Sequence, residues 1–303
     1  MRAAVRDVAA SPSTWLVAAA GFLARGGILV LAVPVLSLPT PVGVTLLVPP
    51  LSVTTSGVAA AFVPQLVVAG AALVVAAAAA LVLGALADAV CWQRIGPLAG
   101  SAADPATDES PAAVTAPLVG KLVAVELLAL LPAAVAAALA ASRLIAVGEQ
   151  EYLLPSSLDV PYVVRVLGGA SQSVIALAAC LLLADVVNAL VSRRVLRRAF
   201  RVGPSPAILR PRRGLRRVVR IAATWISAWV VTLVSLLPGL AAIELAWPGA
   251  RDAYTATIAR DQPGPAVLFA VTVIFVAAWA AAVLVAGLGS SIRTVLWSFA
   301  TVP

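Results

Sequence analysis

Six long stretches of the chain are almost entirely apolar, and short polar segments separate them. A helix needs roughly 20 apolar residues to cross the hydrocarbon core of a bilayer. Backbone polar groups cannot stay unpaired in lipid, so runs of this length must be helices, whereas a membrane β-barrel would show short alternating strands. The pattern predicts an all-α, polytopic transmembrane helical bundle that forms a single integral membrane domain over residues 1–303. The six predicted spans are residues 14–38, 65–90, 118–142, 167–191, 218–246 and 266–288.

The amino-acid composition excludes a water-soluble fold. Hydrophobic residues make up 62% of the chain and charged residues only 11%, whereas about a quarter of the residues in a soluble domain are charged. The polar surface needed to cover a soluble protein of this size is therefore missing. The bilayer is the solvent that this composition fits.

The basic residues are concentrated in one connection between spans. The net charge is +8, and eleven of the 21 lysines and arginines lie between Arg193 and Arg220. Loops of this kind stay on the cytoplasmic side of a membrane. We therefore expect a cytoplasmic arginine-rich loop at residues 192–217. We also expect a multi-pass protein of the cell membrane with both termini in the cytoplasm.

The same loop has a second interpretation beside its role in topology. Arginines near a membrane surface attract anionic lipid headgroups. A nucleic-acid partner is not expected, because no aromatic residues alternate with the arginines and no binding module is recognisable. The candidate contacts to anionic headgroups are Arg193, Arg194, Arg197, Arg198, Arg212, Arg213, Arg216 and Arg217.

Four ionisable residues lie within the predicted spans or near their ends, namely Arg25, Asp88, Glu126 and Asp185. Such groups are costly in a membrane and are candidates for function. In one interpretation they form an intramembrane polar cluster, in which Arg25 pairs with one of the carboxylates beside a cavity open to the cytoplasm. In the other, Asp88 and Asp185 reach the headgroup region, and Glu126 pairs locally with Lys121 or with Arg25.

Two regions of the predicted topology allow alternative interpretations, namely the start of the first span and the segment between the first two spans. Gly26 and Gly27 follow Arg25 directly, so residues 13–24 can be an interfacial helix, with the crossing beginning at Gly26. Residues 39–64 are surplus to the first two spans and rich in Pro, Val, Thr and Ser. They form either an apolar loop on the outer leaflet, which we favour, or a re-entrant segment whose backbone is satisfied by surrounding helices.

A weak internal repeat is also visible. Pro34 and Pro132 are separated by almost the same number of residues as Asp88 and Asp185. This spacing gives the hypothesis of three repeated helical hairpins related by an axis along the membrane normal. Helices rich in Ala, Leu and Val also produce such matches by chance.

The residue types present restrict the chemistry. The chain has no histidine and only two cysteines, Cys91 and Cys180, so histidine-based catalysis and histidine metal sites are excluded. Carboxylates and hydroxyls are the only reacting groups left, and we place an enzyme last among the functions. We expect no catalytic residues, no metal site and no cofactor.

One short string carries a resemblance. Residues 21–27, Gly-Phe-Leu-Ala-Arg-Gly-Gly, are followed by Pro34 and by Leu-Pro-Thr-Pro at 38–41. This opening resembles that of uncharacterised six-span membrane proteins of GC-rich Gram-positive bacteria, and twenty arginines against one lysine are typical of such genomes. The layout of six spans is also distantly similar to the membrane domain family associated with glycerophosphodiester phosphodiesterases. Neither resemblance implies a site.

Two functions remain in view. The first is a transporter or permease-type subunit, which uses the charged residues and proline-bearing helices around a central path and has a membrane or ATPase subunit as its partner. The alternative is a non-enzymatic membrane scaffold or lipid-interacting assembly protein, which holds the bilayer through its arginines and its partners through small-residue helix faces.

Overall fold

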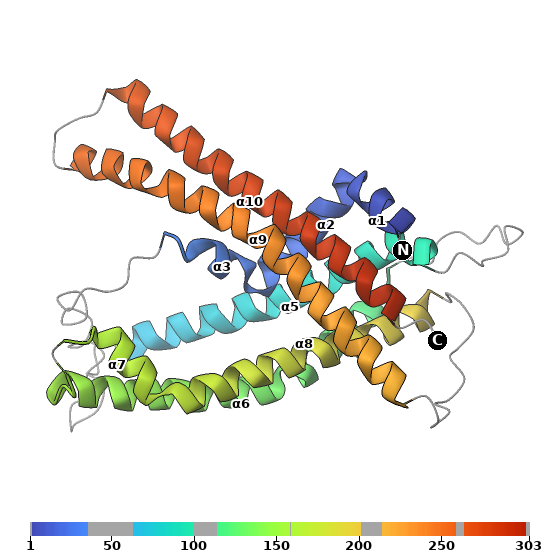
Figure 1. Ribbon diagram of the computed structural model, residues 1–303, viewed down its shortest axis with the longest axis horizontal. Helices are drawn as coiled ribbons and strands as arrows, with labels where there is room; N and C mark the ends of the chain where they lie inside the picture. Colours follow the sequence, from blue (N-terminus) through green and yellow to red (C-terminus); the bar gives the residue numbers. More distant parts are fainter. Residues whose placement is uncertain are drawn as a thin grey trace, which may run out of the picture. The chain divides into compact units, whose positions relative to one another are not determined.

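The described residues form helices, with no strand among them (Figure 1). The computed structural model describes residues 2–35, 63–99, 114–157, 159–200, 214–258 and 264–300. The prediction of an all-α helical bundle is confirmed. In chain order the elements are α1 (Arg2–Ala9), α2 (Pro12–Phe22), the π-helical turn η1 (Leu23–Gly27), α3 (Ile28–Ala32), α5 (Val63–Ala99), α6 (Ala116–Leu153), α7 (Tyr162–Gly169), α8 (Ser171–Ala199), α9 (Gly214–Ile258) and α10 (Pro265–Ala300).

Within the described residues, six helical segments are long and apolar enough to cross a membrane, and they correspond in order to the six predicted spans. The first is composite, because α2, η1 and α3 together make one run from Pro12 to Ala32. The protein is thus a multi-pass membrane protein. The predicted segment 39–64 lies outside the described residues, except that α5 begins at Val63.

The helices extend well past the predicted spans. Helix α9 has 45 residues and is therefore about 67 Å long, more than twice the roughly 30 Å of hydrocarbon in a bilayer. The prediction of a loop over 192–217 was wrong at both ends, since α8 continues to Ala199 and α9 begins at Gly214. Arginine is a good helix former, and Arg197 and Arg198 in the last turn of α8 complement its carbonyl end.

The predicted span 167–191 is interrupted near its start. Helix α7 ends at Gly169, and Ala170 leaves the helical conformation with φ −102° and ψ 7° before α8 begins. Pro132, one of the prolines of the proposed repeat, lies inside the continuous helix α6. The repeat itself stays a prediction.

Many large apolar side chains are exposed, and most of the buried apolar residues are alanines. Leu245 is 83% exposed and Leu128 is 73% exposed, whereas alanines make up much of the buried core. This distribution is unfavourable in water and suits lipid, in which small residues let helices approach closely. The described chain divides into two compact units. Unit 1 comprises residues 1–38, 72–120 and 193–303, and unit 2 comprises residues 39–71 and 121–192.

In unit 1, α9 and α10 run side by side (Figure 1). Their contact depends on small residues, because a Cβ built on Gly239 lies 2.8 Å from the Cβ of Ala282. Farther along, α2 packs on α10 where Gly287 faces Ala19. The N-terminal helix packs on the last turns of α10 through Val8 and Val295.

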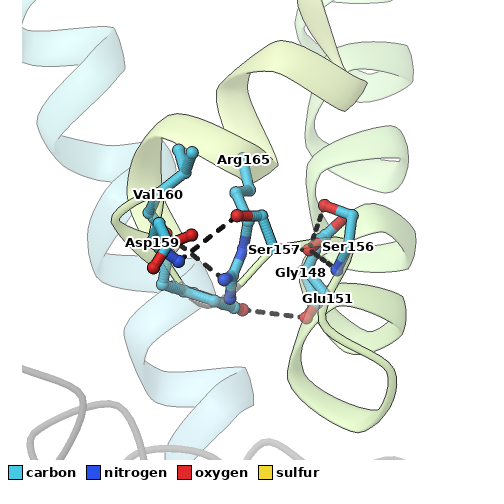
Figure 2. A network of polar contacts seen from close by, with 8 residues as sticks. Gly148, Glu151, Ser156, Ser157, Asp159, Val160 and Arg165 are labelled. Carbon is cyan, nitrogen blue, oxygen red and sulfur yellow. Dashed lines mark hydrogen bonds and ion pairs between the residues drawn. The ribbon is translucent and has the colours of Figure 1, made fainter.

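In unit 2, a polar network fixes the connection between α6 and α7 (Figure 2). The Glu151 carboxylate accepts hydrogen bonds from the backbone N–H and the hydroxyl of Ser156, both at 3.0 Å, and forms an ion pair with Arg165 at 3.0 Å. The Tyr162 hydroxyl donates to the carbonyl of Gly148 at 2.9 Å. These contacts hold the two helix ends together across a short turn.

Candidate functional site

The first membrane helix breaks at the charged residue it carries. Arg25 has φ −83° and ψ 24°, and Gly26 has φ 90°, so neither is helical. A positive φ of this size is accessible to glycine at little cost and strained for other residues. The sequence Arg-Gly-Gly therefore places a kink in the middle of the run Pro12–Ala32. The interruption foreseen at Arg25 is present, as a kink between two helical segments.

Arg25 is paired with Asp88 on α5. Its Nη2 donates to Asp88 Oδ2 at 2.8 Å, and the two side chains are 30% and 19% exposed. Glycine makes this approach possible, because a Cβ built on Gly84 lies 3.2 Å from Arg25 Nε, and one built on Gly21 lies 2.9 Å from Ala87. The ion pair joins two of the four residues of the predicted polar cluster, and the cluster of all four stays a prediction.

A second arginine lies close to this pair. Arg193, near the end of α8, is 5% exposed, and its Cζ lies 5.5 Å from the ring centroid of Trp92 on α5. Trp92 follows Asp88 by one helical turn, so the two side chains lie on the same face of α5. Arg193 interacts electrostatically with Asp88, with Arg25 and with Arg293 of α10. The ends of α5, α8 and α10 thus meet around a group of charged side chains, which we call the polar centre: Arg25, Asp88, Trp92, Arg193 and Arg293.

Arg193 and Arg197 join the last turns of α8 and α10. Arg193 Nη2 donates to Thr294 Oγ1 at 3.3 Å, and Arg197 Nη2 donates to the carbonyl of Ser298 at 2.7 Å. Arg193 and Arg197 are four residues apart, as are Thr294 and Ser298, so the last turns of the two helices lie next to each other. Arg193 is buried and Arg197 is half-buried, whereas the headgroup prediction places both on the surface.

The other predicted lipid contacts divide into two groups. Arg194 and Arg198 are exposed on α8, as contact with a headgroup requires. Arg212 and Arg213 lie outside the described residues. Arg216 and Arg217 belong to the first turns of α9, and their side chains also lie outside what the structure describes.

The four residues of the predicted polar cluster are divided between the two units. Arg25 and Asp88 belong to unit 1, and Glu126 and Asp185 belong to unit 2. Glu126 is 5% exposed on α6, and Asp185 is half-buried on α8. Sequence reasoning missed Trp92, Arg293 and the inward direction of Arg193. The one-turn spacing of Asp88 and Trp92, and that of Arg193 and Arg197, was the available signal.

The polar centre offers charge and hydrogen-bond donors. Among the described residues, no group of three or more acidic or cysteine side chains is placed to hold a metal ion. Guanidinium groups bind carboxylates and phosphates through several N–H donors at once. The chemistry available here is therefore recognition of a negatively charged group. No protein-family model, curated protein or solved structure matches the chain, and the resemblances of the opening string and of the span layout stay predictions.

Proposed function

We propose that this chain is a transporter or permease-type subunit of a bacterial cell membrane, for a solute that carries negative charge. The observation that carries the proposal is the ion pair between Arg25 and Asp88 at the break of a membrane helix. Broken helices line substrate sites in many transporters, because the break frees backbone groups and gives the helix a hinge. Ionisable residues within membrane spans are costly, so their presence there is by default a reason to look for a function.

The proposed orientation places both termini and the polar centre on the cytoplasmic side. Two observations support it. The arginines at the end of α8 and the start of α9 follow the positive-inside rule. The packing of Val8 on Val295 also brings the first and last helices together at one end of unit 1, as expected for an even number of crossings.

The test is flux through the purified protein in proteoliposomes. The probes are inorganic phosphate, succinate and glycerol 3-phosphate, each radiolabelled, with and without a proton gradient. We expect uptake of at least one probe above protein-free liposomes. Arg25→Lys keeps the charge but loses the guanidinium geometry, so it should lower that uptake about tenfold, while Arg143→Lys, on an exposed position of α6, should leave it unchanged.

Two results would count against transport. One is uptake of every probe at the level of empty liposomes, for protein that remains folded and monodisperse. The other is an equal response of uptake to Arg25→Lys and Arg143→Lys. If a membrane or ATPase partner subunit drives the flux, uptake appears in the same assay when that subunit is reconstituted together with this chain.

A second candidate is the lipid-interacting scaffold. Arg194 and Arg198 favour it, because both are exposed at the end of α8, next to the buried Arg193 and the half-buried Arg197. Each such arginine contributes about 1 kcal/mol of attraction near an anionic membrane surface. Loss of co-purifying anionic lipid from the variant Arg194→Gln/Arg198→Gln, without any flux by the parent protein, would favour this alternative.

A further inference from the structure

Arg193 is a buried cation whose hydrogen-bonding capacity is largely unused. It is 5% exposed, and Nη2 alone among its guanidinium nitrogens has an acceptor, the hydroxyl of Thr294 at 3.3 Å. The other two nitrogens, Nε and Nη1, have no acceptor among the described residues. No described carboxylate forms an ion pair with Arg193 either. A buried guanidinium without these partners is strongly destabilising unless something else supplies them.

Trp92, whose ring packs against Arg193, also has a hydrogen-bond donor without an acceptor in the described part of the chain. Trp92 is 1% exposed, and its Nε1 has no acceptor among the described residues. The unmet groups on these two neighbouring side chains are all donors. Both side chains therefore lack an acceptor for these donors within the described residues, and beside a guanidinium cation an acceptor that carries negative charge binds more strongly than a neutral one.

The surrounding charges do not supply it. Asp88 is the acid that acts on Arg193, but its Oδ2 is engaged by Arg25 at 2.8 Å. Arg25 and Arg293 act on Arg193 as like charges. This concentration of positive charge, in surroundings of low dielectric constant, favours a negative ligand more strongly than the same charges would on an open surface.

We infer that Arg193 and Trp92 form a buried site for an oxyanion, namely a phosphate group carried by a lipid headgroup or free in solution. A phosphate group presents several acceptor oxygens in different directions, so one group can accept from the guanidinium and from the indole N–H together. The inference goes beyond the proposed transport, because binding is measurable whether or not flux occurs. If the protein transports solutes, this site identifies them as compounds that carry a phosphate group.

The experiment measures the thermal unfolding midpoint of the full-length protein in a non-ionic detergent. In one arm inorganic phosphate is titrated against sodium chloride of equal ionic strength. In the other, phosphatidylglycerol is added to the micelles and compared with diacylglycerol, which carries no phosphate. A ligand that binds only the folded protein raises the midpoint with its concentration. A rise with phosphate assigns a free anion, and a rise with phosphatidylglycerol alone assigns a lipid headgroup.

Matched variants separate the buried site from surface charge. Arg193→Met should weaken the apparent affinity for the active probe at least about tenfold, as expected for loss of charge-assisted hydrogen bonds. Arg194→Met removes the same charge one residue away, on the exposed side of α8, and should leave the affinity unchanged. Trp92→Phe keeps the ring and removes one donor, so it should weaken binding about threefold, and it decides the matter if Arg193→Met does not fold.

The inference is overturned if neither probe raises the midpoint of the parent protein. It is also overturned if Arg193→Met and Arg194→Met reduce the response equally, or if Trp92→Phe responds as the parent does. If a probe is transported equally well by the parent protein and by Arg193→Met, the transport proposal is supported and the oxyanion site is contradicted. The two proposals can therefore fail separately.

Discussion

Replacing Asp88 with asparagine is expected to lower the free energy of unfolding by about 1–2 kcal/mol, between the effect of an exposed ion pair and that of a fully buried one, because the side chains of Arg25 and Asp88 are 30% and 19% exposed. The variant keeps the size of the side chain and removes its charge. The ion pair between Arg25 and Asp88 at 2.8 Å is then lost, and so is the electrostatic attraction between Asp88 and Arg193. The measurement is equilibrium unfolding in mixed micelles, followed by helical circular dichroism.

The double variant Arg25→Gln/Asp88→Asn distinguishes this cause from a general loss of packing. Removing both charges should recover a large part of the lost stability, because no unpaired charge of the pair is left. Asp252→Asn, at an exposed position of α9, is the matched control and should change stability by less than about 0.5 kcal/mol. Equal effects of Asp88→Asn and Asp252→Asn would contradict the structural role of the pair.

Gly287→Leu should destabilise the protein by about 3 kcal/mol through overpacking of the contact between α2 and α10. A Cβ at this position overlaps the carbonyl oxygen of Trp15 and lies 2.8 Å from the Cβ of Ala19. The neighbouring atoms are backbone and a short side chain, so they cannot rotate away. Helix α2 must then move off α10.

The matched control for this change is Gly70→Leu on α5. A Cβ at Gly70 has nothing within 4 Å, and the exchange of glycine for leucine in an exposed helix adds helix propensity of about 1 kcal/mol. We therefore expect Gly70→Leu to leave the unfolding midpoint unchanged or slightly raised. A midpoint for Gly287→Leu that matched this control would show that α2 does not pack on α10 as described.

The spans were predictable because apolar length is a direct requirement of the bilayer. The helix ends were not, since hydropathy marks the hydrocarbon region and says nothing of where a polar helix stops. Residues 193–199 illustrate this, because their arginines are polar enough for a loop and equally suited to the last turns of α8. The break at Ala170 similarly lies within an apolar run, where hydropathy gives no signal.

The polar centre was predictable only in part. Charge within an apolar run pointed to Arg25 and Asp88, and Gly26-Gly27 indicated the kink. Arg193 and Arg194 are neighbours of the same type, however, and tertiary packing alone turns one inward and leaves the other exposed. Trp92 was likewise not distinguishable by sequence from a tryptophan at the headgroup level.

The orientation proposed for the six crossings is tested most directly by cysteine labelling in intact spheroplasts with a membrane-impermeant maleimide. In a background of Cys91→Ala and Cys180→Ala, single cysteines replace Leu154, which is 77% exposed in the connection between α6 and α7, and Arg198, exposed at the end of α8. Our account predicts labelling at position 154 in intact spheroplasts, and at position 198 only after permeabilisation. Labelling of position 198 in intact spheroplasts, or of both positions alike, would contradict a polar centre on the cytoplasmic side of a six-span protein.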